Sequence, residues 1–393
     1  MELTSSALVY VVALAAALTL LATLWLWPRL ARQRPLPVLG RLGLLTVTQT
    51  AVLTVCALSV NNTFGFYTSW QDLLSPDTSR LALAPAQSGG KGGPPSGDTL
   101  VSPTDEGGLS GITDLPQGKP EEVGRVDSIR VNGKATGLSD QMFIYLPPEY
   151  FNPKYHRERF PVLLTLAGFP GPAAAWLTDL HAVQALWDLQ RTGRMPPTVV
   201  VLARPTVAAP RNTECVNVPG GPQTETWFAK DVPAALRSAY RVSRSGTSWG
   251  VLGYSTGGSC ALRLALRDPE SYAAAAALHG EYQVTPDWST GDLFGGNQQL
   301  AQGYDLGWRL HNEPVPKTSL LVVSTRTEDD YAATQQFLAT AAPVSEAHPE
   351  LTVDSLFLPD GGHTFDTWQR ELPAALEWMG DHLAPPPDRE PRS

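Results

Sequence analysis

The sequence contains little of what metal and nucleic-acid sites require. Its 393 residues include only three cysteines, with no C-x-x-C pair, and its seven histidines show no H-x-x-x-H spacing. Cysteine-based tetrahedral zinc sites are therefore excluded, and we expect no metal and no other cofactor. The net charge is −9, and no basic run interleaved with aromatic residues occurs. We therefore expect no nucleic-acid partner, because phosphate binding needs a clustered basic surface.

Charged residues are absent from two long stretches near the N-terminus. Residues 3–27 are dominated by Leu, Ala and Val, and residues 42–60 form a similar run that is richer in threonine. Each has roughly the 20 residues that a helix needs to cross a bilayer, so we predict two transmembrane helices. A cleaved signal peptide is the alternative for the first run. It has no basic n-region, however, and it begins with Glu2 and shows no clear small-residue cleavage site.

The segment between the two runs is basic. It contains Arg29, Arg32, Arg34 and Arg41 and no acidic residue. The positive-inside rule places such a loop in the cytoplasm. Both ends of the chain then lie outside the cell, so we expect a cell-membrane protein with an extracytoplasmic C-terminal region. Neither run contains a charged residue that would indicate a transporter.

The remaining chain divides by composition. We predict a membrane anchor over 1–75 that ends in an aromatic juxtamembrane segment, and a flexible linker over 76–122 that is rich in Gly, Pro and Ser. A folded domain is predicted over 123–383, and a disordered tail rich in proline and charge over 384–393.

The 123–383 region alternates between strand and helix patterns. Short apolar runs predict strands at 126–131, 142–146, 160–166, 198–203, 272–278, 319–324 and 351–358. Helical patterns lie between them, at about 173–191, 224–240 and 372–382. This alternation indicates an α/β fold with a mostly parallel sheet covered by helices on both faces. Ligands bind such sheets at the carboxyl ends of the strands.

The most informative motif is Gly253-Tyr254-Ser255-Thr256-Gly257. A short apolar strand, 249–252, precedes it, and a helical segment, 258–267, follows it. A G-x-S-x-G string is often an ordinary loop, but between a strand and a helix it forms a sharp turn that exposes the serine hydroxyl. Ser255 is therefore the candidate nucleophile.

A serine nucleophile needs a base and a carboxylate that orients the base. His363, in a glycine-rich loop after the last predicted strand, fits the chain order serine, acid, histidine. His279 is the main rival. Three acids follow the strand at 319–324, and of these we choose Asp329, with Glu328 as the close second.

An oxyanion hole requires two backbone N–H groups near the nucleophile. Thr256, directly after the serine, is expected to supply one. Phe169, in the loop Ala167-Gly168-Phe169-Pro170-Gly171 after an early strand, is expected to supply the other. A plain proline–glycine turn is the alternative for that loop taken alone.

Four segments of residues 123–383 resemble the putative-esterase family, an α/β-hydrolase family that includes esterase D (S-formylglutathione hydrolase) and the actinobacterial mycolyltransferases. These segments are Tyr145 to Pro148, the 167–171 loop, Gly253 to Gly258, and Gly361 to Trp368. Asn61 to Trp70 and Thr213-Glu214-Cys215 are similar to membrane-anchored actinobacterial members. The resemblance implies an α/β-hydrolase fold and acyl-transfer chemistry, and its acid-bearing loop favours Asp329.

Cys215 and Cys260 lie in the region predicted to be extracytoplasmic, where thiols tend to oxidise. We expect them to form a disulfide; two separate buried thiols are the alternative.

Three functions fit the sequence. The leading one is a serine esterase that hydrolyses a small-molecule or envelope ester through an acyl-enzyme. The second is a mycolyltransferase-like acyltransferase that passes the acyl group to a sugar or lipid hydroxyl. The third is a catalytically inactive envelope-binding protein.

Overall fold

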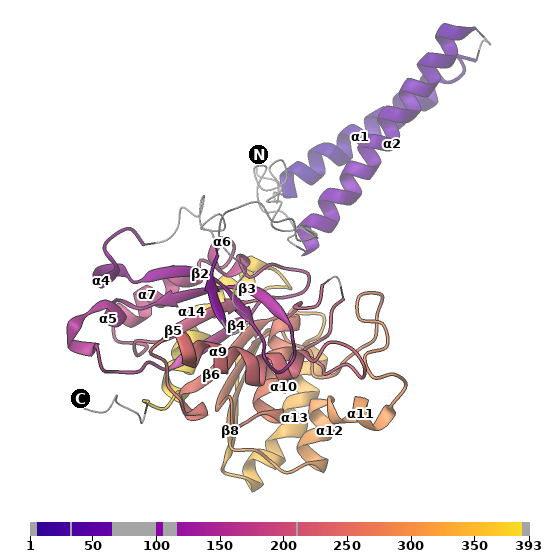
Figure 1. The fold of residues 1–393 in the computed structure, drawn as a ribbon. Coiled ribbons are helices and arrows are strands. Elements are labelled where there is room, and N and C mark those ends of the chain that lie inside the picture. The colour runs from indigo at the N-terminus through magenta and orange to yellow at the C-terminus, as the bar shows by residue number, and fades with distance from the viewer. Residues whose placement is uncertain (1–5, 32–33, 65–99, 105–115, 210, 387–393) are drawn as a thin grey trace. The chain divides into compact units, whose positions relative to one another are not determined.

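The chain forms two compact units, Met1–Gln87 and Ser88–Ser393. The computed structural model describes residues 6–31, 34–64, 100–104, 116–209 and 211–386 (Figure 1). Most of the predicted linker and tail, and the aromatic juxtamembrane residues after 64, lie outside these ranges.

The N-terminal unit is a hairpin of two apolar helices, α1 (Ser6–Leu26) and α2 (Pro35–Phe64) (Figure 1). The hydroxyls of Thr23 and Thr48 lie 3.1 Å apart where the helices pack together. Most of the large apolar side chains described in both helices are exposed. By length and composition, 8–26 and 35–59 are each sufficient to cross a membrane. Helix α2 is longer than the predicted 42–60 because a proline, which is tolerated in the first turn, begins it at residue 35.

The second unit is built on a nine-stranded sheet with the order β1-β2-β3-β5-β4-β6-β7-β8-β9. The first four strands in this order pair antiparallel, and β5 through β9 pair parallel. The strands are β1 (Val101–Pro103), β2 (Arg125–Asn132), β3 (Ser139–Leu146), β4 (Val162–Leu166), β5 (Val199–Ala203), β6 (Trp249–Tyr254), β7 (Ala274–Leu278), β8 (Thr318–Thr325) and β9 (Leu351–Leu358).

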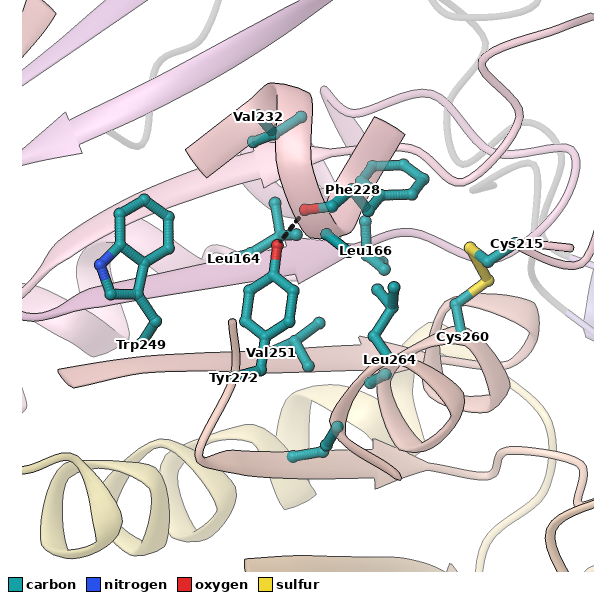
Figure 2. Packing of buried hydrophobic residues seen from close by; sticks show 14 of the residues in the cluster. Leu164, Leu166, Cys215, Phe228, Val232, Trp249, Val251, Cys260, Leu264 and Tyr272 are labelled. Carbon is teal, nitrogen blue, oxygen red and sulfur yellow. Dashed lines mark hydrogen bonds between the residues drawn. A yellow bond between two sulfur atoms is a disulfide. The ribbon is translucent and has the colours of Figure 1, made fainter. Parts of the chain in front are cut away.

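Helices cover both faces of this sheet, because alternate side chains of the buried strands point to opposite sides. Leu164 of β4 belongs to a cluster of buried side chains that includes residues of α9, α10, α12 and α13, whereas its neighbour Leu163 belongs to a second cluster with residues of α6, α7 and α14. Figure 2 shows part of the core on the side of the sheet that contains Leu164. There the hydroxyl of buried Tyr272 donates to the carbonyl of Phe228. The helices are α4 (Pro120–Val123), α5 (Pro148–Phe151), α6 (Ala175–Thr178), α7 (Ala182–Arg191), α8 (Thr224–Thr226), α9 (Val232–Ala239), α10 (Thr256–Arg267), α11 (Gln298–Gly303), α12 (Leu306–Asn312), α13 (Tyr331–Ala347) and α14 (Phe365–His382).

The structure differs from the predicted elements in several places. Strand β1 lies inside the predicted linker, where it pairs with β2, and no apolar pattern marks so short an edge strand. The helix predicted at 173–191 is two helices, because His181 between them has a φ of +47°. Helices α11, α12 and α13 were not predicted. The predicted tail begins too early, since the N–H of Ala384 still donates to the carbonyl of Thr247.

The strand order determines where a site can form. Strands β6, β7, β8 and β9 are consecutive neighbours and parallel, so their carboxyl ends lie side by side at one edge. The loops that follow these strands therefore converge, although they are separated by up to about a hundred residues of sequence.

Candidate active site

Ser255 occupies the sharp turn between β6 and α10. Its φ of +55° lies in a region that residues with side chains seldom adopt. Two backbone contacts fix this conformation: the N–H of Ser255 donates to the carbonyl of Leu278 at 2.9 Å, and the N–H of Ser259 donates to the carbonyl of Ser255 at 3.1 Å. Such strained conformations persist where the surrounding structure over-determines them, and here the turn exposes the hydroxyl above the sheet.

The two glycines that flank Ser255 are required by close backbone packing. A Cβ on Gly253 would lie 2.1 Å from the carbonyl of Gly257, and a Cβ on Gly257 would lie 2.0 Å from the carbonyl oxygen of Leu166. No larger residue fits at either position without moving backbone atoms. Glycine at positions 253 and 257 is therefore what allows α10 to begin in direct contact with β4 and β6.

His363 joins Ser255 to a carboxylate. Its Nε2 lies 2.8 Å from Oγ of Ser255, and its Nδ1 lies 3.0 Å from Oε1 of Glu328. With Nδ1–H donating to the carboxylate, Nε2 is the ring nitrogen that accepts the serine proton. The His363 side chain is 42% exposed and that of Glu328 only 7%. A ligand can thus reach the Ser–His pair, while the carboxylate is shielded from water.

The carboxylate beside His363 belongs to Glu328 and not to the predicted Asp329. Both residues lie in the turn after β8, where the N–H of Glu328 donates to the carbonyl of Thr325, and the N–H of Tyr331 donates to the carbonyl of Glu328. This turn directs the Glu328 side chain inward and leaves Asp329 exposed. The prediction was wrong because the direction of a turn decides among three consecutive acids, and residue types do not encode that direction.

Aromatic side chains hold the His363 ring. The ring of Trp368 meets it edge to face, with centroids 5.0 Å apart, and the ring of Tyr254 packs against Trp368 with centroids 4.5 Å apart. Trp368 and Tyr254 are buried, so this arrangement is part of the core. The histidine loop is thereby positioned by α14, the helix that begins two residues after His363.

The two predicted oxyanion residues are Thr256, which follows Ser255 in the chain, and Phe169, whose loop packs near Ser255. Thr256 is the first residue of α10, and the first N–H groups of a helix have no acceptor within that helix. The 167–171 loop packs against the sharp turn at Ser255, the serine elbow, since a Cβ on Gly168 would lie 3.0 Å from Cβ of Ser255. Phe169 follows in that loop and is half-buried.

His279, the rival candidate for the base, lies at the end of β7 and is buried. Its Nδ1 lies 3.0 Å from Oε2 of Glu328, and its Nε2 lies 2.9 Å from Oε1 of Glu371. Glu371, on α14, was not among the predicted site residues. The sequence does contain a signal for Glu371. This acidic residue falls on the apolar stripe of α14, between Trp368 and the buried residues that follow.

The two histidines control the ionisation of Glu328. Burial raises the pKa of this carboxyl, but hydrogen bonding and the charges of His279 and His363 outweigh burial and lower it to about 2. Potential ligand atoms of these three residues lie within 4.8 Å of one another. The pairing of Glu328 with both rings accounts for the cluster without a metal ion.

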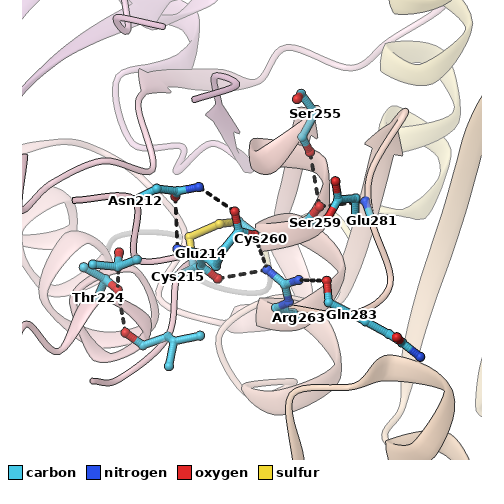
Figure 3. The surroundings of a disulfide bond; sticks show 12 residues. Asn212, Glu214, Cys215, Thr224, Ser255, Ser259, Cys260, Arg263, Glu281 and Gln283 are labelled. Carbon is cyan, nitrogen blue, oxygen red and sulfur yellow. Dashed lines mark hydrogen bonds and ion pairs between the residues drawn. A yellow bond between two sulfur atoms is a disulfide. The ribbon is translucent and has the colours of Figure 1, made fainter. Parts of the chain in front are cut away.

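Helix α10 is tethered at its start to the 211–215 loop. Cys215 and Cys260 form the expected disulfide. One turn further along, buried Arg263 donates to the Glu214 carboxylate at 2.8 Å and to the Gln283 carbonyl at 3.0 Å (Figure 3). These contacts fix the helix whose N-terminus carries the nucleophile.

The parallel sheet, the helices on both faces and the serine elbow at the carboxyl end of β6 define an α/β-hydrolase fold. The chain belongs to the family described as "Putative esterase", whose model matches residues 133–379.

Individual relatives are distant. An uncharacterized protein of Corynebacterium glutamicum is 23% identical over 280 residues, which cover 68% of this chain and 64% of that protein. Among solved structures, a ferulic acid esterase has a TM-score of 0.56 at 16% identity, with 66% of this chain and 98% of that chain covered. An S-formylglutathione hydrolase from Agrobacterium tumefaciens has a TM-score of 0.53 at 14% identity, with 66% and 95% covered. At these identities the solved structures establish the fold alone.

Proposed function

We propose that this chain is a membrane-anchored, extracytoplasmic serine esterase that cleaves carboxylic esters through an acyl-enzyme. The observation that carries the proposal is the hydrogen-bonded series from Ser255 through His363 to Glu328, at the edge of the sheet where hydrolase-fold sites form.

In the proposed reaction, Oγ of Ser255 attacks the carbonyl carbon of the ester, and Nε2 of His363 takes the hydroxyl proton. The tetrahedral intermediate then collapses, the ester C–O bond breaks, and the departing alcohol receives that proton from His363. A water molecule attacks the acyl-enzyme by the same route, which releases the acid and restores Ser255. Glu328 orients His363 and stabilises the imidazolium that forms in each half-reaction.

The negative charge of the tetrahedral oxygen needs donors that are already in place. We assign this role to the backbone N–H groups of Thr256 and Phe169. The start of α10 supports the first assignment, and the close packing of the 167–171 loop on Ser255 supports the second.

The two apolar helices support an anchor in the lipid bilayer. With the arginines between them in the cytoplasm, the esterase domain lies outside the membrane. Location outside the cytoplasm is compatible with the Cys215–Cys260 disulfide, because such bonds persist in oxidising compartments.

The test uses the full-length chain purified in detergent. We expect a fluorophosphonate to label it and p-nitrophenyl esters of increasing chain length to be hydrolysed, and we expect Ser255→Ala to abolish both activities. Absence of labelling, or equal labelling of Ser255→Ala, contradicts the proposal and favours an inactive binding protein.

A second arm separates hydrolysis from transfer. The esterase releases free acid at the same rate with or without an added sugar. If the acyl group is recovered on the sugar, the acyl-enzyme stands but the chain is an acyltransferase.

A further inference from the structure

His279 is enclosed between two carboxylates, one of which is the proposed catalytic acid. Its side chain is 1% exposed, as against 7% for Glu328 and 0% for Glu371. The His279 backbone is also fixed, because its N–H donates to the carbonyl of Val323 at 2.9 Å while its φ is +53°. The proposed reaction uses neither His279 nor Glu371.

The two neighbouring carboxyl groups favour a cation at His279. Two carboxylates buried close together cannot both stay ionised unless a positive group lies between them. Burial lowers the pKa of His279, but the hydrogen bonds and charges of Glu328 and Glu371 outweigh burial and raise it to about 9. At neutral pH a positively charged His279 then lies between the Glu328 and Glu371 side chains.

We propose that His279 and Glu371 are positioning residues, which keep Glu328 ionised and hold its second oxygen so that the first faces His363. This inference rests on the proposed function, in which Glu328 orients the catalytic base. Nδ1 of His279 lies at ion-pair distance from Oε2 of Glu328, and Nδ1 of His363 hydrogen-bonds to Oε1, so each carboxylate oxygen has a histidine partner. We call this arrangement the clamp. Glu371 in turn binds the far nitrogen of His279 and fixes its ring. No proton is transferred between Glu371, His279 and Glu328.

The clamp matters most when His363 takes the serine proton. The Glu328 carboxylate then lies between two imidazolium rings, those of His279 and His363. Without the His279 cation, one of the two buried carboxylates gains a proton, and a protonated Glu328 no longer stabilises the imidazolium.

Other ionisable groups face this cluster from the neighbouring elements. Glu281, which follows His279 in the loop after β7, interacts with His363, Glu214, Asp330 and Arg263. Burial and the nearby acids raise the pKa of the Glu281 carboxyl, while Arg263 and His363 lower it. Substitutions at 279 and 371 leave Glu281 and these partners in place, so their effects can be assigned to the clamp.

The experiment compares His279→Gln, Glu371→Gln and the double variant with wild type, all as full-length chains in detergent. The matched control is His348→Gln, which removes a histidine that pairs with Glu350 at 3.2 Å on the exposed surface. We expect His279→Gln to lower kcat roughly 10- to 100-fold, by analogy with the range seen for partners that orient metal-binding histidines, with KM unchanged. The acid limb of the kcat/KM profile moves to higher pH, because Glu328 and Glu371 now compete for a proton.

The double variant is the decisive one. It removes the unpaired Glu371 carboxylate, so its kcat is expected to exceed that of His279→Gln and its acid limb to return toward the wild-type position. His348→Gln matches wild type throughout. The clamp is rejected if His279→Gln keeps the wild-type kcat and pH profile, if it changes KM alone, or if the double variant is no better than His279→Gln.

Histidine-selective NMR titration decides the inference without substrate. In the wild type, His279 should remain an imidazolium to about pH 9. In Glu371→Gln it should lose its proton at lower pH, and this variant keeps the test open if His279→Gln does not fold. A neutral His279 at pH 7 rejects the clamp even if no ester is hydrolysed, whereas an inactive wild type with charged His279 rejects only the esterase proposal.

Discussion

At the scale of single residues, the site depends on one carboxylate with two histidine neighbours. One carboxylate oxygen of Glu328 faces Nδ1 of His363, and the other faces Nδ1 of the buried His279. A glutamate in this position is therefore held more firmly than a carboxylate with a single partner, because rotation about its last bond would break both contacts.

Glu328→Gln should lower kcat by on the order of 10³- to 10⁴-fold, because the amide neither stabilises the imidazolium nor fixes the tautomer of His363. Asp329→Asn is the matched control and should remain close to wild type, since Asp329 is exposed. The measurement is kcat for a p-nitrophenyl ester. A large loss in Asp329→Asn with an active Glu328→Gln would reverse the assignment.

The raised pKa of His279 predicts how stability varies with pH. A group whose folded pKa is above its ordinary value near 6.5 stabilises the fold fully below that value, and this contribution disappears as the pH rises through about 9. The unfolding temperature of the wild type should therefore fall between pH 6.5 and 9.5, and that of His279→Gln should fall less. Parallel curves for the two proteins would contradict this expectation.

At the scale of elements, the site is made by the loops after four neighbouring strands and by the helix that begins at the nucleophile. Helix α10 is fixed at one end by the elbow and along its length by Cys260 and Arg263. The serine is thus positioned by contacts that lie well outside the G-x-S-x-G motif.

Loss of the Cys215–Cys260 disulfide should destabilise the folded domain. The bond closes a loop of 45 residues, for which chain entropy gives about 4 kcal/mol. Cys215→Ser/Cys260→Ser should unfold at lower denaturant concentration than wild type, as followed by tryptophan fluorescence. The control is Cys56→Ser, which removes an exposed free cysteine of α2 and should leave the midpoint unchanged.

Gly257→Ala should abolish fluorophosphonate labelling, since the new Cβ would lie 2.0 Å from the carbonyl oxygen of Leu166 and displace the start of α10. Gly307→Ala, in helix α12, is the control, because its Cβ would meet only ordinary contacts from 3.4 Å outward. Normal labelling of Gly257→Ala would show that the elbow tolerates a larger residue.

At the scale of the whole molecule, an apolar helical hairpin and an α/β-hydrolase domain are joined in one chain. Each unit has its own internal packing. Mostly exposed apolar side chains on α1 and α2 contrast with the buried ones of the sheet, which is the pattern of helices that face lipid.

A reporter fusion tests the orientation of the anchor. An alkaline phosphatase joined after residue 80 should be active, because the proposed topology keeps the basic segment between α1 and α2 in the cytoplasm and places the chain beyond α2 outside. A phosphatase joined within the basic segment itself should be inactive. The reverse pattern would place the esterase domain in the cytoplasm.

Residue patterns alone predicted the fold class and indicated Ser255 and His363 as candidate site residues, whose Oγ and Nε2 lie 2.8 Å apart in the structure. Apolar runs of strand length alternate with helical patterns, and the glycines around Ser255 are a local steric requirement that stays visible in any context. His363 was identifiable because the chain order of an α/β-hydrolase places the histidine after the last strand.

Only the tertiary structure decided which carboxylate faces His363 and what surrounds it. Glu328, His279 and Glu371 come from two loops and a helix that meet because β7, β8 and β9 are neighbours and α14 packs against them. Their function depends on distances and burial across these elements, which no local pattern specifies. A turn of three acids, a rival histidine and a glutamate on an apolar stripe were visible in the sequence, but only packing made them one electrostatic unit.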